Sequence, residues 1–454
     1  MIKVTLSQIA DITRGKRFGD DLLIDAVSTD TRTIDRGALF VALVGERFDA
    51  HNFCQQAVDA GAGALLVEKR LDVNVPQIVV SDTKLALGEF ASWVHQACKT
   101  PTVAITGSCG KTTVKEMVAS ILQLKGKVLF TAGNFNNDIG VPLTLLRSQQ
   151  DDDYAVIELG ANHIGEIAYT TQLVKPDIAL VNNVAAAHLE GFGSIDGVKQ
   201  AKGEIYQGLS AGGIAIVNLD SNGEAKWDEV LADKKVITFS QSNTDADFFA
   251  SNIVLNAEGE ASFDLHIAAS SQEIELSLGI IGQHNVANAI AASIIALRMG
   301  ATLEEVRAGL KHLNKVKGRV EVEALSEKIK LIDDSYNASV PAMKAAVDLL
   351  AAFPGQRWLI LGNMAELGEE SLALHRQVGE HAAPQKFEHV LTYGADAKVI
   401  SDLCQGIHFE THQEMIEYIK QHLDQAVPEN HTMLVKGANG ARMFEVAAAL
   451  KEYY

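Results

Sequence analysis

A glycine-rich run at residues 106–113, Thr-Gly-Ser-Cys-Gly-Lys-Thr-Thr, constrains the fold of this chain more than any other stretch. The apolar segment 102–105 directly precedes it, and residues 114–122 follow it with apolar side chains at helical spacing. A strand, a glycine turn and a helix in this order form the setting that a phosphate-binding loop requires. The run therefore predicts an α/β domain with a phosphate site at the carboxyl end of the strand.

The residue types within this run fit a nucleoside triphosphate. Gly107 and Gly110 let backbone N–H groups turn toward phosphate oxygens, and the helix N-terminus adds partial positive charge. Lys111 can neutralise the β- and γ-phosphates, while the Thr112 hydroxyl can ligate Mg²⁺. The spacing departs from the common GxxxxGK[ST] form, because only two residues separate the two glycines. An ordinary strand–helix turn that contains glycines is the alternative interpretation.

Length and composition indicate a packed protein of several domains. At roughly 150 residues per domain, 454 residues suggest about three domains, which we expect at 1–82, 83–314 and 315–454. No run of 18 apolar residues predicts a membrane span, the first residues do not resemble a signal peptide, and the four cysteines are scattered. We therefore expect a cytoplasmic protein. The net charge of −19 argues against nucleic acid as a partner.

Apolar runs alternate with helical patterns over most of the chain, which predicts βαβ units and mainly parallel sheets. Two segments within 246–279 instead alternate with period two, and we expect them to form antiparallel strands appended to the central sheet. The expected strands are 40–44, 64–67 and 77–80; then 103–105, 128–131, 154–159, 178–184, 214–218, 236–240, 262–267 and 273–278; and finally 330–332, 358–361, 390–393 and 433–435. The expected helices include 52–61, 85–98, 285–299 and 303–313.

Two side chains are expected beside the phosphate loop because they follow central strands. Ligands collect at the carboxyl ends of strands in open α/β sheets, and Glu158 ends one such strand. A carboxylate in that place suits Mg²⁺, although a solvated surface carboxylate has the same sequence signature. His188 follows the next strand and could add a second metal position, or it could be a hydrogen-bonded structural histidine.

Further candidates lie downstream. Lys202 is expected near the start of a helix, where its residue type alone indicates a solvated surface charge, since a free ammonium cannot ligate Mg²⁺. Asn285 opens a helix with amides that could read a base edge. Arg319 follows an expected domain hinge, and Asp334 ends a strand of the last unit. Each of the last two could equally be a plain surface or capping residue.

The order of these motifs resembles the Mur ligases of peptidoglycan synthesis. The resemblance covers nearly the whole chain and rests on these segments: TGSCGKTT at 106–113, GNFNNDIGVP at 133–142, IELGANHIGEI at 157–167, NNVAAAHLEGFGS at 182–194, AKGEIY at 201–206, GQHNVANA at 282–289, GR at 318–319 and DDSYNA at 333–338. More specific are VSTDTR at 27–32 with LFVALVGERFDAH at 39–51, and GNMAELG at 362–368.

The resemblance implies a role for each matching residue. The metal set would be Thr112, Glu158, His188 and Lys202, with Lys202 carbamylated by CO₂ and two Mg²⁺ ions bound. The catalytic residues would be Lys111, His188 and Lys202. The ATP site would comprise Gly107, Ser108, Cys109, Gly110, Lys111, Thr112, Thr113, Asn285, Arg319 and Asp334. The UDP-linked substrate would contact Ser28, Thr29, Asp30, Thr31, Arg32, Asn134 and Asn137.

The resemblance also implies a fold and an activity. The expected fold is a small α/β N-terminal substrate domain, a central ATPase domain and a Rossmann-like C-terminal domain. The implied reaction uses ATP and Mg²⁺ to join D-alanyl-D-alanine to a UDP-N-acetylmuramoyl-tripeptide through an acyl phosphate, and we expect a monomer. A folylpolyglutamate-synthase-like ligase and a regulatory NTPase that switches conformation on hydrolysis are the alternatives, although the VSTDTR segment argues against the former.

Overall fold

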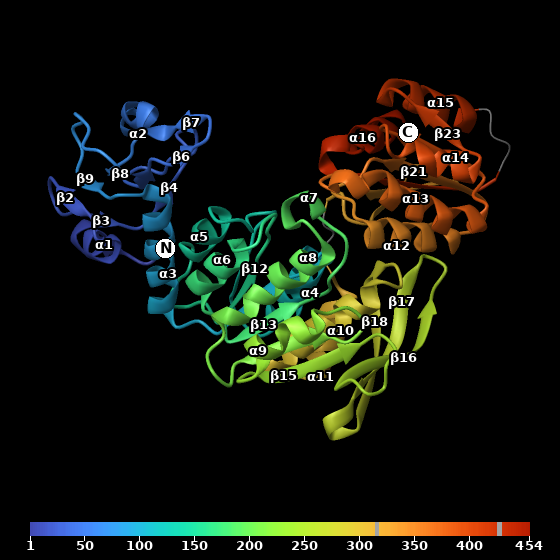
Figure 1. The fold of residues 1–454 in the computed structure, drawn as a ribbon, viewed down its shortest axis with the longest axis horizontal. Coiled ribbons are helices and arrows are strands. Elements are labelled where there is room, and N and C mark those ends of the chain that lie inside the picture. Colours follow the sequence, from blue (N-terminus) through green and yellow to red (C-terminus); the bar gives the residue numbers. More distant parts are fainter. Residues whose placement is uncertain (314–316, 425–428) are drawn as a thin grey trace.

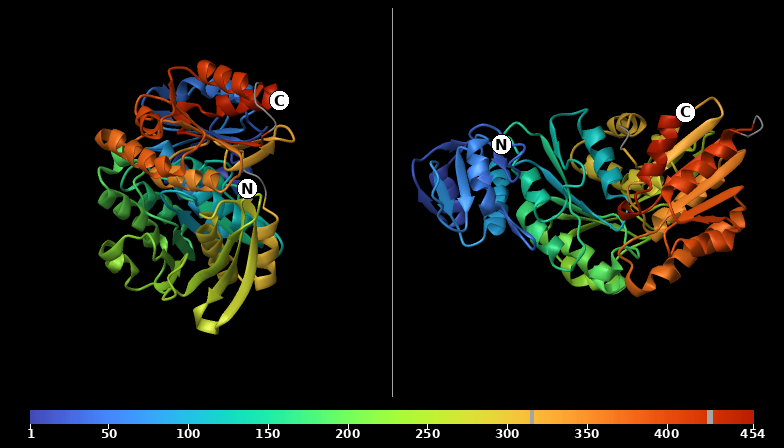
Figure 2. Two further views of the ribbon diagram at one scale, coloured as in Figure 1. Left: turned by 90° about the vertical axis from the view of Figure 1, so that its right-hand side faces the viewer. Right: turned by 90° about the horizontal axis from the view of Figure 1, so that it is seen from above.

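The computed structural model describes residues 1–313, 317–424 and 429–454, which form three α/β domains, each built on its own sheet. The central domain lies between the other two, and the C-terminal domain packs beside the antiparallel end of the central sheet (Figures 1 and 2). The three-domain α/β prediction is confirmed. The second expected domain limit, between 314 and 315, lies outside the described residues.

The N-terminal domain carries a five-stranded sheet in the order β2-β9-β8-β5-β4, parallel except for β2. The pairs β1–β3 and β6–β7 form two small antiparallel additions. Its strands are β1 (Val4–Thr5), β2 (Lys16–Phe18), β3 (Leu23–Ile24), β4 (Val27–Ser28), β5 (Leu39–Val41), β6 (Val44–Gly45), β7 (Phe48–Asp49), β8 (Ala64–Val67) and β9 (Gln77–Val79). Its helices are α1 (Leu6–Thr13), η1 (Ala50–Phe53) and α2 (Cys54–Asp59).

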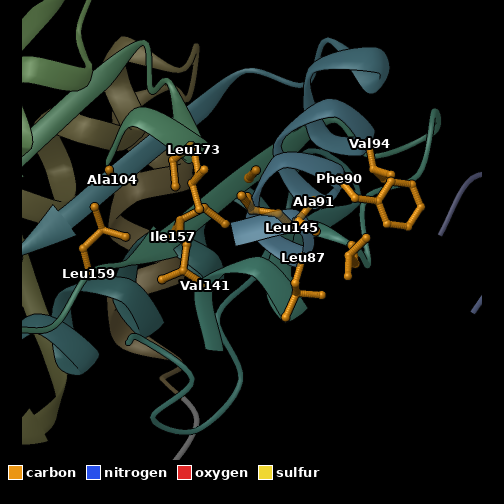
Figure 3. Packing of buried hydrophobic residues seen from close by; sticks show 14 of the residues in the cluster. Leu87, Phe90, Ala91, Val94, Ala104, Val141, Leu145, Ile157, Leu159 and Leu173 are labelled. Atoms are coloured by element: carbon orange, nitrogen blue, oxygen red, sulfur yellow. The ribbon is translucent and has the colours of Figure 1, made fainter. Parts of the chain in front are cut away.

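Helix α3 (Thr83–Cys98) belongs to the cores of both the first and the second domain. Its apolar side chains, among them Leu87, Phe90 and Val94, share one buried cluster with residues of the N-terminal sheet and of the central sheet. Figure 3 shows part of this packing, where α3 meets Val141 and Leu145. The two domains are therefore joined by a continuous hydrophobic core.

The central domain contains a nine-stranded sheet in the order β11-β12-β10-β13-β14-β15-β16-β17-β18. The strands from β11 to β16 run parallel, and β17 and β18 are added antiparallel, as the change of period predicted. The strands are β10 (Thr102–Thr106), β11 (Val128–Phe130), β12 (Tyr154–Glu158), β13 (Ile178–Val181), β14 (Ile214–Asn218), β15 (Lys235–Ser240), β16 (Phe248–Leu255), β17 (Glu260–Ile267) and β18 (Gln272–Ile281).

Helices cover both faces of this sheet, and buried aliphatic side chains from β10, α4 and α10 form a second cluster between them. The helices are α4 (Lys111–Leu122), α5 (Gly140–Leu145), α6 (Glu166–Val174), α7 (Leu189–Phe192), α8 (Ile195–Gly203), η2 (Glu204–Gly208), η3 (Glu224–Trp227), α9 (Asp228–Leu231), η4 (Ala268–Ser270), α10 (Asn285–Arg298) and α11 (Leu303–Lys311).

The C-terminal domain has a six-stranded sheet in the order β19-β20-β24-β21-β22-β23, parallel except for β19. The strands are β19 (Glu321–Ala324), β20 (Ile329–Asp334), β21 (Gln356–Gly362), β22 (His389–Tyr393), β23 (Ile407–Phe409) and β24 (His431–Lys436). The helices are α12 (Val340–Ala351), η5 (Gly368–Glu370), α13 (Ser371–Ala382), η6 (Ala383–Gln385), α14 (Lys398–Cys404), α15 (His412–Asp424), η7 (Asn439–Ala441) and α16 (Phe444–Tyr453).

Several details differ from the sequence-based prediction. The strand expected at 40–44 is divided, because β5 ends at Val41 and β6 begins at Val44. The strand expected at 178–184 ends at Val181, where the chain enters a loop. Strands β16, β19 and β23 were not predicted as separate elements. Lys202 was placed near the start of a helix, which is wrong: it lies in the last turn of α8.

Candidate functional site

The glycine run forms the expected turn between β10 and α4. Gly107 and Gly110 both have positive φ angles, of 154° and 77°, and Gly110 is the N-cap residue of α4. A Cβ atom on Gly110 would lie 2.6 Å from side-chain atoms of both Asn182 and Asn288. A side chain at this position is therefore excluded both by conformation and by space.

Two asparagines that directly follow β13 hold the loop by hydrogen bonds. Asn183 accepts the Cys109 N–H at 2.9 Å, and both Asn182 and Asn183 donate to the Cys109 carbonyl at 3.1 Å. Ser108 donates its N–H to the Asn183 carbonyl at 3.0 Å. The N–H groups of Ser108 and Cys109 are thus engaged within the protein, so the phosphate-facing donors of the loop come from other residues.

A hydroxyl and a carboxylate meet at the start of α4. The Thr112 hydroxyl donates to Glu158 at 2.9 Å, and Asn136 donates to the other carboxylate oxygen at 2.8 Å. Strand β12, which ends at Glu158, is paired directly with β10, so the sheet itself brings the two groups together. Glu158 is only 1% exposed. Hard oxygen donors beside a phosphate loop fit Mg²⁺, although the described residues contain no group of three or more His, Cys, Asp or Glu side chains placed to hold a metal.

Lys111 lies beside the same turn. Its ammonium donates to the Gly107 carbonyl at 2.8 Å. Burial lowers the pKa of Lys111, while the negative charge of Glu158 partly opposes that shift. A cation held in a poorly solvated position interacts strongly with an anion that enters the site.

His188 connects the central domain to the C-terminal domain. It is half-buried just before α7, with a φ of 54°, and its Nδ1 contacts the Glu366 carboxylate of the last domain. Burial lowers the pKa of His188, and Glu366 acts in the opposite direction. In this arrangement His188 makes an inter-domain ion pair when it is protonated.

Lys202 is not a solvated surface charge: it is 1% exposed. Its ammonium lies 5.3 Å from the centre of the Phe192 ring and has no hydrogen-bond partner in the part of the chain that the structure describes. Burial lowers the pKa of Lys202 well below its usual value, and the nearby charge of Lys111 adds to the effect. The surface interpretation of this residue is therefore wrong.

The C-terminal domain contributes a charged group to the same site. Asp334, at the end of β20, forms an ion pair of 2.6 Å with the buried Lys436 and accepts the Val320 N–H at 3.2 Å. The neighbouring Arg319 guanidinium lies 4.2 Å from the centre of the Tyr336 ring. These contacts bring the two expected residues, Arg319 and Asp334, to one place.

A cavity of about 540 Å³ lies among these groups and is lined by residues of both the central and the C-terminal domain. Of the expected nucleotide and metal residues, it is lined by Ser108, Cys109, Gly110, Lys111, Thr112, Thr113, Glu158, His188, Asn285, Arg319 and Asp334, together with Asn134. Gly107, Asn137, Lys202 and residues 28–32 do not line it. Asn137 instead accepts the Gly140 N–H at 2.7 Å at the start of α5.

The segment 28–32 lies in the N-terminal domain and organises itself through local contacts. Ser28 accepts the Asp30 N–H at 3.1 Å, and Asp30 and Arg32 form an ion pair of 2.7 Å. The hydrogen bond from the Arg32 side chain holds the pKa of Asp30 at about 2. The segment is a preformed turn that presents an exposed guanidinium.

The sequence did not identify every residue of the cavity as functional. Asn182 and Asn288 support the phosphate loop, Lys436 pairs with Asp334, and Glu366 contacts His188. For Lys436 the sequence signal was its position at the end of a strand of the C-terminal domain, within 433–436. For Glu366 it was the position shortly after another such strand, within 362–368. Their partners lie about 100 residues or more away, which no local pattern encodes.

A second cavity, of about 390 Å³, lies at the opposite edge of the central sheet, beside the first residues of β10, β13 and β14. Its cations have a structural explanation. Lys99 and Lys175 are the C-cap residues of α3 and α6, and Arg298 ends α10. Positive side chains at helix C-termini stabilise the helix dipole. The cations of this cavity therefore do not indicate a second ligand site.

The fold and the first cavity define a phosphate-loop α/β protein whose nucleotide-type site is completed by a second α/β domain. Family models match three parts of the chain: the Mur ligase family catalytic domain over 23–94, the Mur ligase middle domain over 105–296, and the Mur ligase glutamate ligase domain over 318–439. The chain belongs to the Mur ligase family.

Individual relatives extend over the whole length. The chain is 51% identical to the UDP-N-acetylmuramoyl-tripeptide–D-alanyl-D-alanine ligase of Escherichia coli, over 100% of this chain and 99% of that protein. A crystal structure of MurF from Acinetobacter baumannii superposes with a TM-score of 0.94 at 35% identity, over 100% and 99% of the two chains. MurF ligase from Thermotoga maritima in complex with ADP gives 0.83 at 25% identity, over 94% and 97%.

Proposed function

We propose that this chain is an ATP-dependent ligase that joins D-alanyl-D-alanine to UDP-N-acetylmuramoyl-tripeptide, with release of ADP and phosphate, in the synthesis of peptidoglycan precursors. The full-length similarity to the Escherichia coli ligase of that name supports this activity. The observation that carries it is the cavity between two domains, where the phosphate loop, Glu158 and the Asp334–Lys436 pair converge. The ADP complex of the Thermotoga relative supports ATP as the phosphoryl donor.

The nucleotide occupies this cavity in the proposed function. Residues 107–113 hold its phosphates, with Lys111 facing the γ-phosphate, and Asn285, Arg319 and Asp334 lie toward its base, phosphates and ribose. Lys111 neutralises charge that develops on the transferring phosphoryl group. The second domain excludes water when it closes over the site, which protects an activated acyl group from hydrolysis.

Magnesium fits the donor chemistry at the loop. The oxygens of Thr112 and Glu158 would hold one ion, and His188 and a modified Lys202 would contribute to a second. When bound, the metal supplies positive charge that offsets the phosphate oxygens. The protein's own part is to keep the Glu158 carboxylate oriented, which the Asn136 and Thr112 contacts do.

Lys202 is proposed to be carbamylated. Its amine adds to CO₂, so that a new N–C bond forms and a proton leaves, which converts a cation into an anionic oxygen donor. The burial of Lys202 beside the Phe192 ring supports this modification, because an unpaired ammonium is costly in such surroundings. An oxygen donor also suits Mg²⁺, whereas an ammonium does not.

The reaction then has two balanced steps. The terminal carboxylate of the tripeptide attacks the γ-phosphorus, which forms an acyl phosphate and releases ADP. The amine of D-alanyl-D-alanine attacks the acyl carbon, which forms the amide and releases phosphate and a proton. Residues 28–32 are proposed to hold the UDP end of the first substrate, and Asn134 and Asn137 to lie nearer its peptide.

The domain limits after residues 82 and 314, a monomeric state and a cytoplasmic location complete the proposal. Within the described residues no helix is long and apolar enough to cross a membrane. The location is supported by the chemistry of the substrates, since ATP and UDP-linked intermediates are intracellular metabolites.

A coupled phosphate-release assay tests the activity. Phosphate release should require ATP, a UDP-N-acetylmuramoyl-tripeptide and D-alanyl-D-alanine together, and omission of either acceptor should reduce it to background. Testing tripeptides with diaminopimelate or lysine at position three would define the substrate. ATP hydrolysis that is independent of both acceptors and stimulated by a protein partner would refute the ligase and support a regulatory NTPase instead.

A further inference from the structure

Asn182 occupies the point where β13 leaves the central sheet beneath the phosphate loop. Its backbone is fixed on both sides: the N–H donates to the Thr106 carbonyl at 2.8 Å, and the carbonyl accepts from Asn218 at 2.9 Å. The residue is 2% exposed. Its side chain therefore projects from a rigid strand end.

The side-chain amide of Asn182 bridges two acceptors. Nδ2 donates to the Cys109 carbonyl at 3.1 Å and to Asn288 Oδ1 at 2.9 Å. Because both partners are oxygens, the amide can be oriented only with its NH₂ group toward them. Its Oδ1 is buried and has no hydrogen-bond partner among the described residues, so the bridge is maintained despite an unsatisfied acceptor.

The bridge continues into α10. Asn288 donates to Asn285 Oδ1 at 2.8 Å, and Asn285 donates to the Ile281 carbonyl at the end of β18, also at 2.8 Å. Three consecutive amides thus connect the middle of the phosphate loop to the start of the helix on which Asn285 lies. The close approach of Gly110 to Asn182 and Asn288 makes the loop rest directly on this chain.

This arrangement has a direct electrostatic consequence. A loop that binds phosphate must turn its carbonyl oxygens away from the anion, since each exposes negative partial charge. The Cys109 carbonyl is held in that orientation by the amides of Asn182 and Asn183. Asn182 also donates a hydrogen bond to Asn288.

We propose that Asn182 is a positioning residue for the nucleotide. It holds the Cys109 carbonyl away from the phosphates and links the phosphate loop to α10. The loop and the start of α10, where Asn285 lies, thereby keep a fixed position relative to each other. The inference rests on the proposed binding of ATP in this cavity. Asn182 acts through the loop and through Asn288.

The first test compares Asn182→Ala with the wild-type protein by calorimetric titration of ADP. Loss of two hydrogen bonds should weaken ADP binding about ten-fold. The Michaelis constant for ATP should rise similarly, while that for the UDP-tripeptide should stay within about two-fold. Asn182→Ser, which is too short to bridge both acceptors, gives the same comparison should the alanine variant fold poorly.

Thr171→Ala is the matched control for stability. Thr171 is also fully buried in the central domain, where its hydroxyl donates to the Ile205 carbonyl at 2.9 Å, and it does not line the cavity. This variant should lower the melting temperature without changing ADP affinity. An effect of Asn182→Ala on ADP no larger than that of the control would overturn the inference.

A double-mutant cycle tests the bridge itself. If Asn182 acts partly through Asn288, adding Asn182→Ala to Asn288→Ala should weaken ADP binding by clearly less than the ten-fold seen in the wild-type background. Additive effects would refute the coupling. If the wild-type protein binds neither ADP nor ATP, the proposed function fails instead, so the two failures are distinguishable.

Discussion

The phosphate-loop region of the central domain and the 28–32 segment of the N-terminal domain both contain cations, but they hold them differently. Lys202 is buried and Lys111 is half-buried, and loss of solvation lowers the pKa of each. The side chain of Arg32 is 82% exposed and already paired with Asp30. The central region therefore keeps its charges at an electrostatic cost, whereas the N-terminal region keeps an Arg–Asp pair at the surface.

The difference indicates that the central region contributes to catalysis and the 28–32 segment to substrate binding. A charge in poorly solvated surroundings interacts strongly with charge that develops during a reaction. An exposed guanidinium can recognise a phosphate or carboxylate but is screened by water and salt. We therefore expect changes in the central region to affect rates and changes in the 28–32 segment to affect the binding of one substrate.

The largest effect is expected for Lys111→Ala. Removing a cation that faces the transferring phosphoryl group should reduce the ligation rate by about 10²–10³ while the fold is retained. Steady-state kinetics at saturating ATP, with circular dichroism to check folding, measures this. Lys125→Ala, just beyond the far end of α4, is the control and should retain its activity. Near-wild-type turnover of Lys111→Ala would contradict the assignment of the loop.

The stability of the core that α3 shares between the first two domains should depend on pH. His95, on α3, is buried, with its ring nitrogens 2.8 Å from Ser148 and 2.9 Å from Thr102. Burial lowers the pKa of His95 to about 4. Between pH 6.5 and 4 the unfolded chain binds a proton at His95 that the folded protein does not. The contribution of His95 to the free energy of unfolding is therefore complete above pH 6.5 and is lost as the pH is lowered. The loss should approach about 3 kcal/mol near pH 4.

Urea unfolding at several pH values measures this dependence. His95→Gln should flatten the wild-type curve over that window, since the variant has no imidazole to protonate. The matched change at the exposed His312 should leave the slope unaltered. If the free energy of unfolding of His95→Gln and of the wild-type protein changed with pH to the same extent, protonation of His95 would not be the cause of the dependence.

Lys202 provides the sharpest test of the central region. Lys202→Ala should lose about 10–100-fold in activity, as expected for a residue that supports a metal site. Formate or acetate should restore part of that activity by filling the vacated space with a carboxylate. Lys202→Arg should not substitute, because a guanidinium neither forms the carbamate nor has the right charge. Full activity of Lys202→Arg would refute the carbamate.

The smallest effect is expected for Arg32→Ala in the N-terminal region. It should raise the Michaelis constant for the UDP-tripeptide about ten-fold, the value of one charged hydrogen bond, with little change for ATP or D-alanyl-D-alanine. The melting temperature should hardly change, since exposed ion pairs contribute little stability. Equal effects on all three substrates would indicate a folding defect and remove the contrast between the regions.

Much of the fold was predictable because its signals are local. The strands at 64–67 and 214–218 match β8 and β14 residue for residue, since buried parallel strands are continuous apolar runs between turns. The loop at 106–113 was recognisable because its glycines, lysine and threonines are contiguous. Edge strands such as β19 and β23 are short and partly exposed, so their sequences carry little pattern.

Long-range relations were not predictable from pattern. Lys202 has an ordinary helical context, and its burial results from the packing of Phe192 and of neighbouring helices around it. The bridge from Asn182 to Asn288 joins residues 106 positions apart. Such contacts depend on how elements assemble, so residue type and spacing alone left these residues either unassigned or on the surface.

The helix shared by the first two domains bears on the order in which the chain can fold during synthesis. Once residue 98 has emerged from the ribosome, α3 can cover the N-terminal sheet and complete that core. Its other face stays uncovered until α5 and α6 have been made, at residue 174. For about 75 residues of elongation, the nascent chain exposes an apolar face, the kind of surface to which chaperones bind. The central domain thus begins on a surface that the first domain has already set in place.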